Sequence, residues 1–580
     1  MLYLKAFEKN TDLIEKLGVG NAYLCWAIAL YLDYSDVEQL ATDSLTDHSN
    51  DKKIDFIRLD LDSKKIVFAQ GVYYQKTFDT AGSNKASDLN TASAWLVSGD
   101  LEDVPDKLKA IIIDCRKAIN NGDIEQIDIL FVHNRSEAKN AFKEIETVAN
   151  HLKKSLPSEL NINTLARELG IETLERLYSA QESSIIVQES IECPAKIQFM
   201  EEGPNWKSAI LSVSGAWLRD LFQRHSDDLF SANYRGFLGI TQRRKINTGI
   251  RQSAENDSKN FWVYNNGITI LTREFKEKAD TDITILDGIS ILNGAQTTGS
   301  IGSVESKYNL NKVKVLCRVI QCLDSNTIGQ IVKYNNTQNE ITTWDLYSNS
   351  AEQKRIAKEF KDFKHEYSLK RGFSASSATL GIEQVIQPLL AFSGDFQSAS
   401  RGKNSLFESR NFYDQAFKAK KARHILFVHT LSKAIDAKKF DLKEKENSKN
   451  ILTLEEQELN LFRNLRFKNF LIAVIAKSLE SILKEKTDLG QIAFTPNAAT
   501  ATNKSIDDLI ALWLPAVNIV LDFVTTLVTT NNKDLSEILS EDGVLDNIAN
   551  SVRAYIHTFQ ALNPISPVQE SFKNSVSPKG

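Results

Sequence analysis

The hydrophobic pattern of this sequence changes near residue 350, and that change limits the folds open to the chain. Before residue 350, short apolar or alternating runs typical of strands lie between segments with helical spacing. After it the pattern is helical almost throughout, as at 351–366, 411–437, 455–486 and 505–528. A chain of 580 residues is also too long for one hydrophobic core. The sequence therefore predicts α/β domains followed by a helical region.

The first part of the chain has the features of an α/β domain. Two strand-like runs flank a turn at Asp62–Lys64, which predicts a β-hairpin, and a further buried strand, IDILFVH, follows two helical segments. The last residues carry three prolines among serines and lysines, which is typical of disorder. We expect an α/β domain at 1–155, a connector at 156–194, a second α/β domain at 195–349, a helical region at 350–562 and a disordered tail at 563–580.

Charge, cysteine content and one apolar stretch indicate which classes of protein this chain does not belong to. With 70 basic and 75 acidic side chains the net charge is −5, which argues against an extended basic coat but allows a local basic patch. The five cysteines are scattered, as is usual for reduced thiols in a cytosolic protein. The apolar stretch 509–528 contains Pro515, Asn518 and Asp522, which favours a buried bundle helix over a membrane span. We expect a soluble cytoplasmic protein.

Three clusters rich in asparagine and glutamine distinguish the second domain. They are FWVYNNGITI at 261–270, read as a strand, ILNGAQTTGS at 291–300 and YNNTQNEIT at 334–342. Each alone fits turn formation and helix capping. Three in one domain favour recognition of a polar ligand, because amides both donate and accept hydrogen bonds.

Two features near these clusters suit an anion. In ILNGAQTT a strand would pass through Asn293 and Gly294 into a helix whose first N–H groups point at one place, as in many phosphate sites. Upstream, five basic residues lie within seventeen positions. A solvated surface is the usual explanation of such a run, but phosphate contact is the alternative. The five are Arg235, Arg243, Arg244, Lys245 and Arg251.

These segments together resemble the AIPR family of abortive-infection phage-resistance proteins, over about residues 215–417. The resemblance rests on an ordered series of motifs: an NxR segment, an N-x-GI segment, FWxYNNGIT, NGxQT and a later N-x-QN element. The matching residues are Asn233, Arg235, Asn247, Gly249, Ile250, Phe261, Trp262, Tyr264, Asn265, Asn266, Gly267, Asn293, Gly294, Gln296, Thr297, Asn336, Gln338 and Asn339.

The resemblance implies antiviral defence, often beside partner proteins of a defence operon, and no single chemistry. A weaker likeness to DGQHR-type and ParB/sulfiredoxin-like domains implies nucleotide or DNA contact, by analogy of fold only. We therefore expect DNA or RNA as a ligand. Phosphate contacts are expected from Arg235, Arg243, Arg244 and Lys245, and a polar recognition site from Asn265, Asn266, Gly267, Asn293, Gly294, Gln296, Thr297, Asn336, Gln338 and Asn339.

The segment NDKKIDFIRLDLDSKKIVFAQGVYYQK resembles the metal-dependent PD-(D/E)xK nuclease core. Asp55 and Gln70 match its first two positions, where two oxygens would hold Mg²⁺. Val72 stands where the family has a lysine, and valine can neither orient water nor stabilise charge. We expect a restriction-endonuclease-like fold without nuclease activity. An active metal-dependent nuclease, and a hairpin with no site at all, remain open.

Other motifs narrow the function further. There is no GxxxxGK[ST], GxSxG or HExxH element. His424 and His429 lie five apart on a helix, which does not suit a metal pair. Trp217, Trp262, Trp344 and Trp513 are expected in the core rather than as surfaces on which bases stack. A non-enzymatic scaffold or sensor for partner defence proteins is the remaining alternative.

Overall fold

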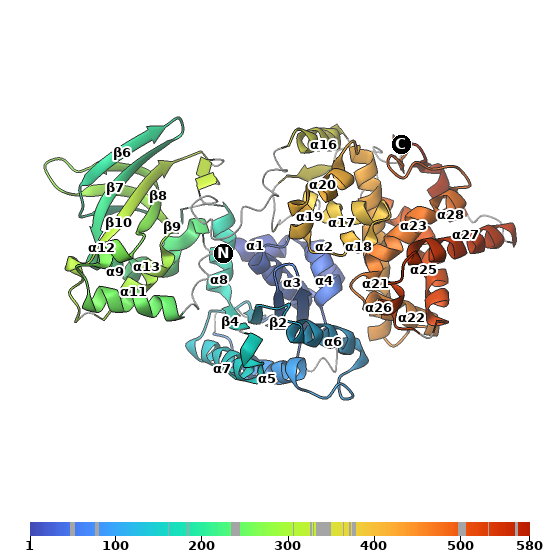
Figure 1. Ribbon diagram of the computed structural model, residues 1–580, viewed down its shortest axis with the longest axis horizontal. Helices are drawn as coiled ribbons and strands as arrows, with labels where there is room; N and C mark the ends of the chain where they lie inside the picture. The colour runs from blue at the N-terminus through green and yellow to red at the C-terminus, as the bar shows by residue number, and fades with distance from the viewer. Residues whose placement is uncertain are drawn as a thin grey trace. The chain divides into compact units, whose positions relative to one another are not determined.

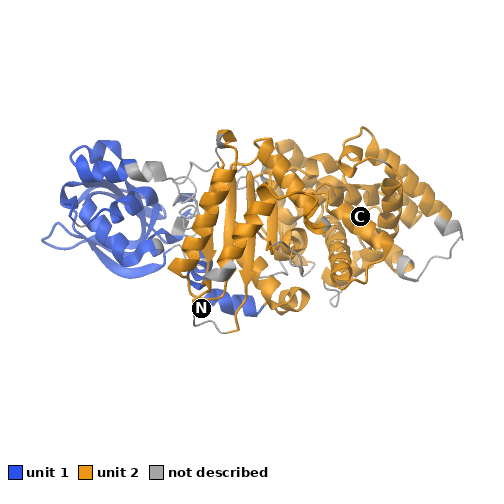
Figure 2. Ribbon diagram, turned by 90° about the horizontal axis from the view of Figure 1, so that it is seen from below, with its two compact units in different colours: residues 1–9, 171–341 blue, residues 10–170, 342–580 orange. Residues whose placement is uncertain are grey.

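The computed structural model describes the chain in two compact units (Figures 1 and 2). Unit 1 comprises residues 1–9 and 171–341, and unit 2 comprises residues 10–170 and 342–580. The units therefore alternate along the sequence instead of following one another. The described residues are 1–580 without 47–52, 76–79, 161, 183–184, 234–243, 306, 325–326, 329, 332–349, 363–364, 370–372, 374–378, 497–505, 532 and 563–566.

Unit 2 begins with helices and a four-stranded sheet. The sheet has the order β1-β2-β3-β4, with β1 and β2 antiparallel and the other neighbours parallel. The expected hairpin and the strand IDILFVH are confirmed as β1, β2 and β3. The elements are α2 Thr11–Leu17, α3 Val19–Leu32, α4 Val37–Ser44, β1 Phe56–Asp60, β2 Lys65–Val72, α5 Ser83–Val97, α6 Asp106–Asn120, β3 Gln126–His133, α7 Lys139–Ser155, η1 Ser158–Leu160 and β4 Asn163–Leu169.

Alternation along the strands gives this sheet two apolar faces. Ile57, Phe68, Ile129 and Phe131 point to one face and pack with α5 and α7 in a common core. The other face is covered by α3, which is buried along most of its length. The segment expected to be a connector supplies β4, because the buried run Thr164–Leu169 extends the sheet by one parallel strand.

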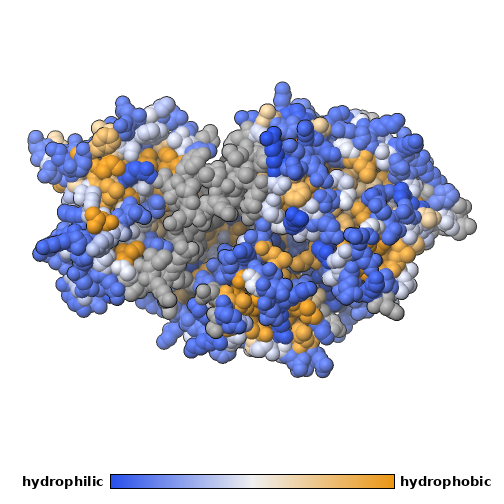
Figure 3. Space-filling view, viewed as in Figure 1, coloured by the Kyte–Doolittle hydropathy of each residue, from blue (hydrophilic) through white to orange (hydrophobic). Residues whose placement is uncertain are grey.

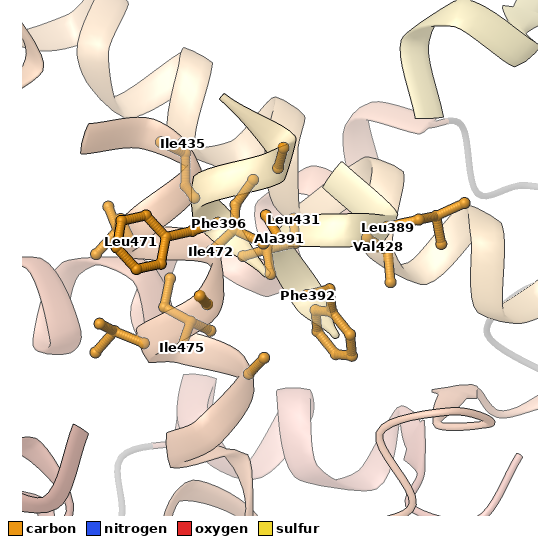
Figure 4. Packing of buried hydrophobic residues seen from close by; sticks show 14 of the residues in the cluster. Leu389, Ala391, Phe392, Phe396, Val428, Leu431, Ile435, Leu471, Ile472 and Ile475 are labelled. Atoms are coloured by element: carbon orange, nitrogen blue, oxygen red, sulfur yellow. The ribbon is translucent and has the colours of Figure 1, made fainter. Parts of the chain in front are cut away.

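The rest of unit 2 is mainly helical, as the sequence pattern predicts. Its core is a set of long helices that pack Leu, Ile and Phe side chains together, as around Phe396 and Ile475 (Figure 4). The elements are α16 Ala351–Asp362, β11 Glu366–Ser368, β12 Thr379–Gly381, α17 Ile382–Phe392, α18 Phe396–Ala399, α19 Lys403–Glu408, α20 Arg410–Phe417, α21 Ala422–Asn447, α22 Thr453–Phe462, α23 Phe467–Leu483, β13 Ala493–Phe494, α25 Ile506–Thr529, α26 Leu535–Ile538, α27 Val544–Leu562, α28 Pro567–Asn574 and β14 Val576–Ser577.

Two ion pairs, the first of them mostly buried, join the two parts of unit 2. Lys433 on α21 contacts Asp36 at 2.6 Å, and Lys439 contacts Asp43 at 2.8 Å. Burial disfavours the Asp36 carboxylate, but Lys433 more than offsets this, so the pKa of Asp36 is lowered. Lys443 donates to the carbonyl of Thr42 at 2.6 Å at the end of α4. Burial and the neighbouring Lys439 lower the pKa of Lys443 to about 7.

The C-terminal segment differs from the disordered tail expected at 563–580. Residues 567–574 form α28, and β14 pairs with β13 through Phe494 and Val576. Phe572 and Val576 are buried in the helical core. The prolines at the start of the segment suggested disorder, but two apolar side chains beyond them are enough to fix it to the core.

The helix α25 is long and apolar enough to cross a membrane by length and composition alone, and no other helix of the described residues is. Leu509, Trp513, Val517, Val520 and Val524 are buried along one face of α25 within the helical core. Packing thus accounts for its apolar sequence, as expected for a bundle helix. The molecular face drawn in Figure 3 is mostly hydrophilic, with apolar patches on both units.

Unit 1 is built on a six-stranded sheet of order β5-β9-β8-β10-β7-β6. Only the β8–β10 pair is parallel. Helices α9 and α13 pack together, and α9 contacts β7 (Figure 1). The elements are α1 Leu2–Glu8, α8 Ile171–Glu182, β5 Val187–Cys193, β6 Ile197–Gly203, β7 Trp206–Ser214, α9 Gly215–His225, η2 Ser226–Asn233, α11 Arg244–Asn256, α12 Phe261–Tyr264, β8 Ile268–Glu277, β9 Thr284–Asn293, α13 Ala295–Gly302, η3 Leu310–Lys312 and β10 Lys314–Cys322.

Candidate functional site

Two asparagine-glycine turns meet at one end of the unit 1 sheet. The turn at Asn265–Gly267 leads into β8, and the turn at Asn293–Gly294 leaves β9. Because β8 and β9 are antiparallel, with Thr269 opposite Asn293, the start of one strand lies beside the end of the other. The structure therefore brings together two of the three clusters that the sequence singles out.

Both glycines are required by backbone geometry. Gly267 has a φ of 80°, and a Cβ there would overlap the carbonyl oxygen of Leu316 on β10. Gly294 has a φ of 91°, and its Cβ would lie 2.5 Å from Cγ2 of Ile268. Only glycine combines a left-handed backbone with so close an approach. The two turns are thus packed against the sheet with no room for a side chain.

The side chain of Asn265 fastens one turn to the other. Its Nδ2 donates to Oγ1 of Thr297 at 3.0 Å, and its Oδ1 accepts the N–H of Gly267 at 2.8 Å. Thr297 is buried in the first turn of α13. Asn265 and Thr297 therefore have a structural part in this site: they hold the first turn of α13 against the entry to β8.

The first turn of α13 keeps its backbone donors available. Gly294 occupies the N-cap and has no side chain with which to cap the helix, and the first turn contains no acid. The N–H of Gly294 donates to Oδ1 of Asn293 at 2.7 Å, and the N–H of Thr298 donates to the carbonyl of Gly294 at 2.9 Å. The three N–H groups between them, of residues 295–297, meet no acceptor among the described residues. Such a turn attracts anions through its donors and the helix dipole.

Two amide side chains are free beside this helix start. Asn266 is exposed and Gln296 is half-buried, and neither forms a hydrogen bond with the described residues. Exposed lysines lie at the start of β10, at 312 and 314. Because β10 is parallel to β8, with Cys317 beside Ile268, β10 also starts at this end of the sheet. The sheet end therefore carries donors and positive charge.

Several expected site residues cannot be located. Arg235 and Arg243 lie outside the described residues, and so do Asn336, Gln338 and Asn339. Arg244 and Lys245 belong to α11, but their side chains are not described. The expectation that these residues contact phosphate or line the recognition site stays a prediction. Arg251, the last of the basic run, is paired with Glu255 at 2.7 Å.

The carboxylate of Asp55 is held by internal hydrogen bonds. Its Oδ2 accepts from Nε2 of Gln70 at 2.6 Å and from the N–H of Gly71 at 2.7 Å. Both side chains are buried, and Oε1 of Gln70 has no partner. Val72, two residues on, packs against the apolar core of the sheet. Asp55 and Gln70 therefore lie together, as the resemblance to the nuclease core implies.

These residues do not fit a magnesium site. The side-chain N–H of Gln70 donates to the Asp55 carboxylate. This N–H therefore supplies the positive partner that a metal ion would provide. No cluster of three His, Cys, Asp or Glu side chains suited to a metal occurs in the described part of the chain. His424 and His429 are buried on α21, and burial lowers their pKa to about 4 and about 3.

Sequence reasoning missed a second buried polar pair on the same face of this sheet. Nε2 of His133, at the end of β3, lies 3.0 Å from Oε1 of Glu168 on β4. The same oxygen accepts the N–H of Ala138 at 2.9 Å. Phe131 pairs with Glu168 in register, so His133 and Glu168 are diagonal neighbours on one face. Strand parity was the available signal, but β4 was assigned to a connector.

The tryptophans divide between core and surface. Trp217 and Trp513 are buried, as expected, and donate their indole N–H to the carbonyls of Glu192 and Phe427. The expectation is wrong for Trp262, which is 41% exposed on α12. Trp344 lies outside the described residues. The structure also places 261–264 in a helical turn rather than in a strand, because the chain must bend before Gly267.

Comparison with known proteins gives one match. The family model described as "AIPR protein" matches residues 230–562, which is more than half of the chain. The match covers α13 and its turns together with most of the helical region of unit 2. No curated protein and no solved structure matches the chain.

Proposed function

The chain belongs to the AIPR family, which indicates phage defence of the abortive-infection type, and we propose that its core acts there by binding phosphate groups of a nucleic acid or nucleotide. The observation that carries this proposal is the uncapped first turn of α13. Three backbone N–H groups without an acceptor lie there beside two free amides, Asn266 and Gln296. Backbone donors at a helix start bind phosphate without any reorganisation of side chains.

The local distribution of acids supports an anionic ligand. No acidic residue occurs between Asp257 and Glu274, or between Asp287 and Glu305. These two stretches form both turns and the whole of α13. The net charge of the chain is negative, so a stretch free of acids at this sheet end is a local feature. It removes the repulsion that a phosphate would meet elsewhere on the surface.

An isosteric change of charge tests the proposal. Gln296→Glu places a carboxylate in the first turn of α13, where it is compatible with the helix dipole but repels phosphate. Gln198→Glu is the matched control, since Gln198 is exposed on the edge strand β6 at the other side of the sheet. The probes are fluorescently labelled DNA and RNA, with ATP and pyrophosphate as competitors, at two salt concentrations.

We expect Gln296→Glu to weaken binding of the labelled nucleic acid or the competitor by at least about tenfold, and Gln198→Glu to leave it unchanged. Binding is expected to weaken as salt rises, because phosphate contacts release counterions. Equal affinity of wild type and Gln296→Glu would contradict the proposal. Unchanged thermal unfolding of both variants would confirm that folding is not at issue.

For the N-terminal sheet we propose a nuclease-like fold without cleavage. The hydrogen bond from Gln70 to Asp55 and the apolar packing of Val72 support it. Cleavage of DNA or RNA with Mg²⁺ or Mn²⁺ that is abolished in Asp55→Ala would contradict it and favour the active-nuclease alternative. Co-purification of a defence protein, with no affinity for nucleic acid or nucleotide, would favour the scaffold alternative.

A further inference from the structure

The one-turn helix α12 presents three consecutive large apolar residues to solvent. Phe261 is fully buried and anchors the turn, while Trp262, Val263 and Tyr264 are 41%, 74% and 64% exposed. A hydrophobic residue exposed singly is ordinary, but three in succession mark a contact surface. We call these three residues the α12 platform.

The platform lies beside the phosphate site proposed above. The N–H of Asn265, which directly follows Tyr264, donates to the carbonyl of Phe261 at 3.1 Å. The side chain of Asn265 donates in turn to Thr297 in α13. The α12 helix also packs against β10. The aromatic rings and the first turn of α13 are thus linked by one asparagine.

The two aromatic side chains have unused polar atoms. The indole N–H of Trp262 and the hydroxyl of Tyr264 form no hydrogen bond with the described residues. Buried tryptophans of this chain, such as Trp217, donate theirs to a backbone carbonyl. An aromatic ring with one apolar face and a free polar atom is suited to a ligand that is itself flat and polar.

The surroundings of the platform are rich in donors. Lys259 and Asn266 are exposed at either side of α12, and Lys312 and Lys314 are exposed at the start of β10. Asp257 is engaged by Nδ2 of Asn260 at 2.9 Å. Positive charge around exposed aromatic rings is the combination found where proteins hold unpaired bases and their phosphates.

We propose that the α12 platform stacks the bases of a single-stranded nucleic acid, with Trp262 and Tyr264 as the stacking side chains. This inference rests on the phosphate binding proposed for α13 and names its ligand class. Bases in a duplex are stacked on each other and cannot reach these rings, whereas a single strand offers free base faces. The lysines at 259, 312 and 314 then contact the backbone phosphates.

The test measures the affinity of the full chain for a labelled single strand and for the same sequence as a blunt duplex. The strand is longer than the roughly 4–16 nucleotides that one such site covers. The variants are Trp262→Leu and Tyr264→Leu, which keep an apolar side chain but lose the ring, and Trp262→Phe, which keeps a ring. Trp206→Leu is the matched control, since Trp206 is 37% exposed on β7, away from α12.

We expect wild type to prefer the single strand and each leucine variant at α12 to weaken that binding by roughly tenfold. Trp262→Phe should keep most of the affinity, and Trp206→Leu all of it. Single strands should quench tryptophan fluorescence in wild type, and the quenching should be reduced in Trp262→Phe.

Three results would overturn the inference. Equal binding of single strand and duplex, or unaltered single-strand binding by Trp262→Leu while Gln296→Glu loses it, would leave the phosphate site standing without the platform. Loss of self-association in Trp262→Leu, with unaltered binding, would assign the platform to a second copy of the chain. Absence of any binding by wild type would overturn both proposals together.

Discussion

The polar groups of the two sites, one on each sheet, differ in whether they have hydrogen-bond partners within the protein. In unit 2, Asp55 accepts two internal hydrogen bonds and Glu168 is bonded to both His133 and a backbone N–H. In unit 1, the donors of the first turn of α13 and the amide of Gln296 have no described partner. Buried polar groups that satisfy one another stabilise a fold, whereas donors left open at a surface are available to a ligand. The closed site therefore contributes to the stability of the fold, and the open one has donors available for the ligand proposed above.

The largest expected effect is on the closed site. Glu168→Ala leaves His133 and the N–H of Ala138 buried without their partner, which should lower the free energy of unfolding by about 4 kcal/mol. Urea unfolding measures it. Glu125→Ala is the control, since its pair with Lys64 lies at the surface and should contribute less than about 1 kcal/mol. Equal losses in the two variants would remove the distinction between closed and exposed pairs.

A second effect concerns the glycine that shapes the open site. Gly267→Ala forces a Cβ against the Leu316 carbonyl and should cost about 3 kcal/mol of stability. Gly249→Ala, within α11 and with open space around its Cβ, should instead stabilise by about 0.5–1 kcal/mol. Thermal unfolding of the two variants separates these outcomes. A tolerated alanine at 267 would mean that the turn can relax away from β10.

A third effect is a dependence on pH of the stability of unit 2. The pKa of His424 is lowered to about 4 by burial and by Lys420, from an ordinary value near 6.5. Between about pH 6.5 and about pH 4 the unfolded state therefore binds a proton that the folded state does not, and stability falls as pH falls. The loss between about pH 7 and about pH 5 should be about 2 kcal/mol for His424 alone.

The variant His424→Asn keeps a donor for the Ile492 carbonyl, which the imidazole contacts at 2.7 Å, and should flatten this pH dependence. Urea unfolding of wild type and His424→Asn, measured at a series of pH values between about 7 and about 5, reports the change. An unaltered slope in His424→Asn would place the acid sensitivity in other groups of unit 2.

The smallest expected change in stability is that of Asn266→Ala, and this variant also tests the open site directly. Asn266→Ala removes an exposed amide that bonds to no described residue, so unfolding should shift by no more than about 0.5 kcal/mol. Binding of a single strand should nevertheless weaken measurably. Asn265→Ala, which breaks the bond to Thr297, should reduce both stability and binding. Identical behaviour of the two variants would mean that the two asparagines do not have different roles.

Much of the fold follows from sequence pattern, because strand alternation and helix spacing are local. The hairpin of β1 and β2, the strand β3, the end of β9 at Asn293 and the helical region were predictable in this way. The place of β4 in the sheet was not, since it depends on register with β3. The run FWVY has the residues of a strand, but the turn that Gly267 imposes makes it a helical turn.

The residues of the two turns could be singled out from the sequence, but their contacts could not. The asparagines, glycines and Thr297 of both turns were found from sequence alone. That Asn265 bonds to Thr297 while Asn266 stays free depends on side-chain direction, which two adjacent asparagines do not reveal. The exposure of Trp262 was missed for the same reason, because one residue of rotation around a helical turn decides between core and solvent.

The two parts of unit 2 are separated in the sequence by unit 1, and this affects when unit 2 can be completed during synthesis. The ribosome completes residues 10–170 long before it reaches residue 433, yet Asp36 and Asp43 take their partners from α21. Until Lys433 and Lys439 emerge, Asp36 and Asp43 lack the lysines with which they pair in the folded protein. Completion of these contacts in unit 2 therefore requires translation to at least residue 439 of the 580.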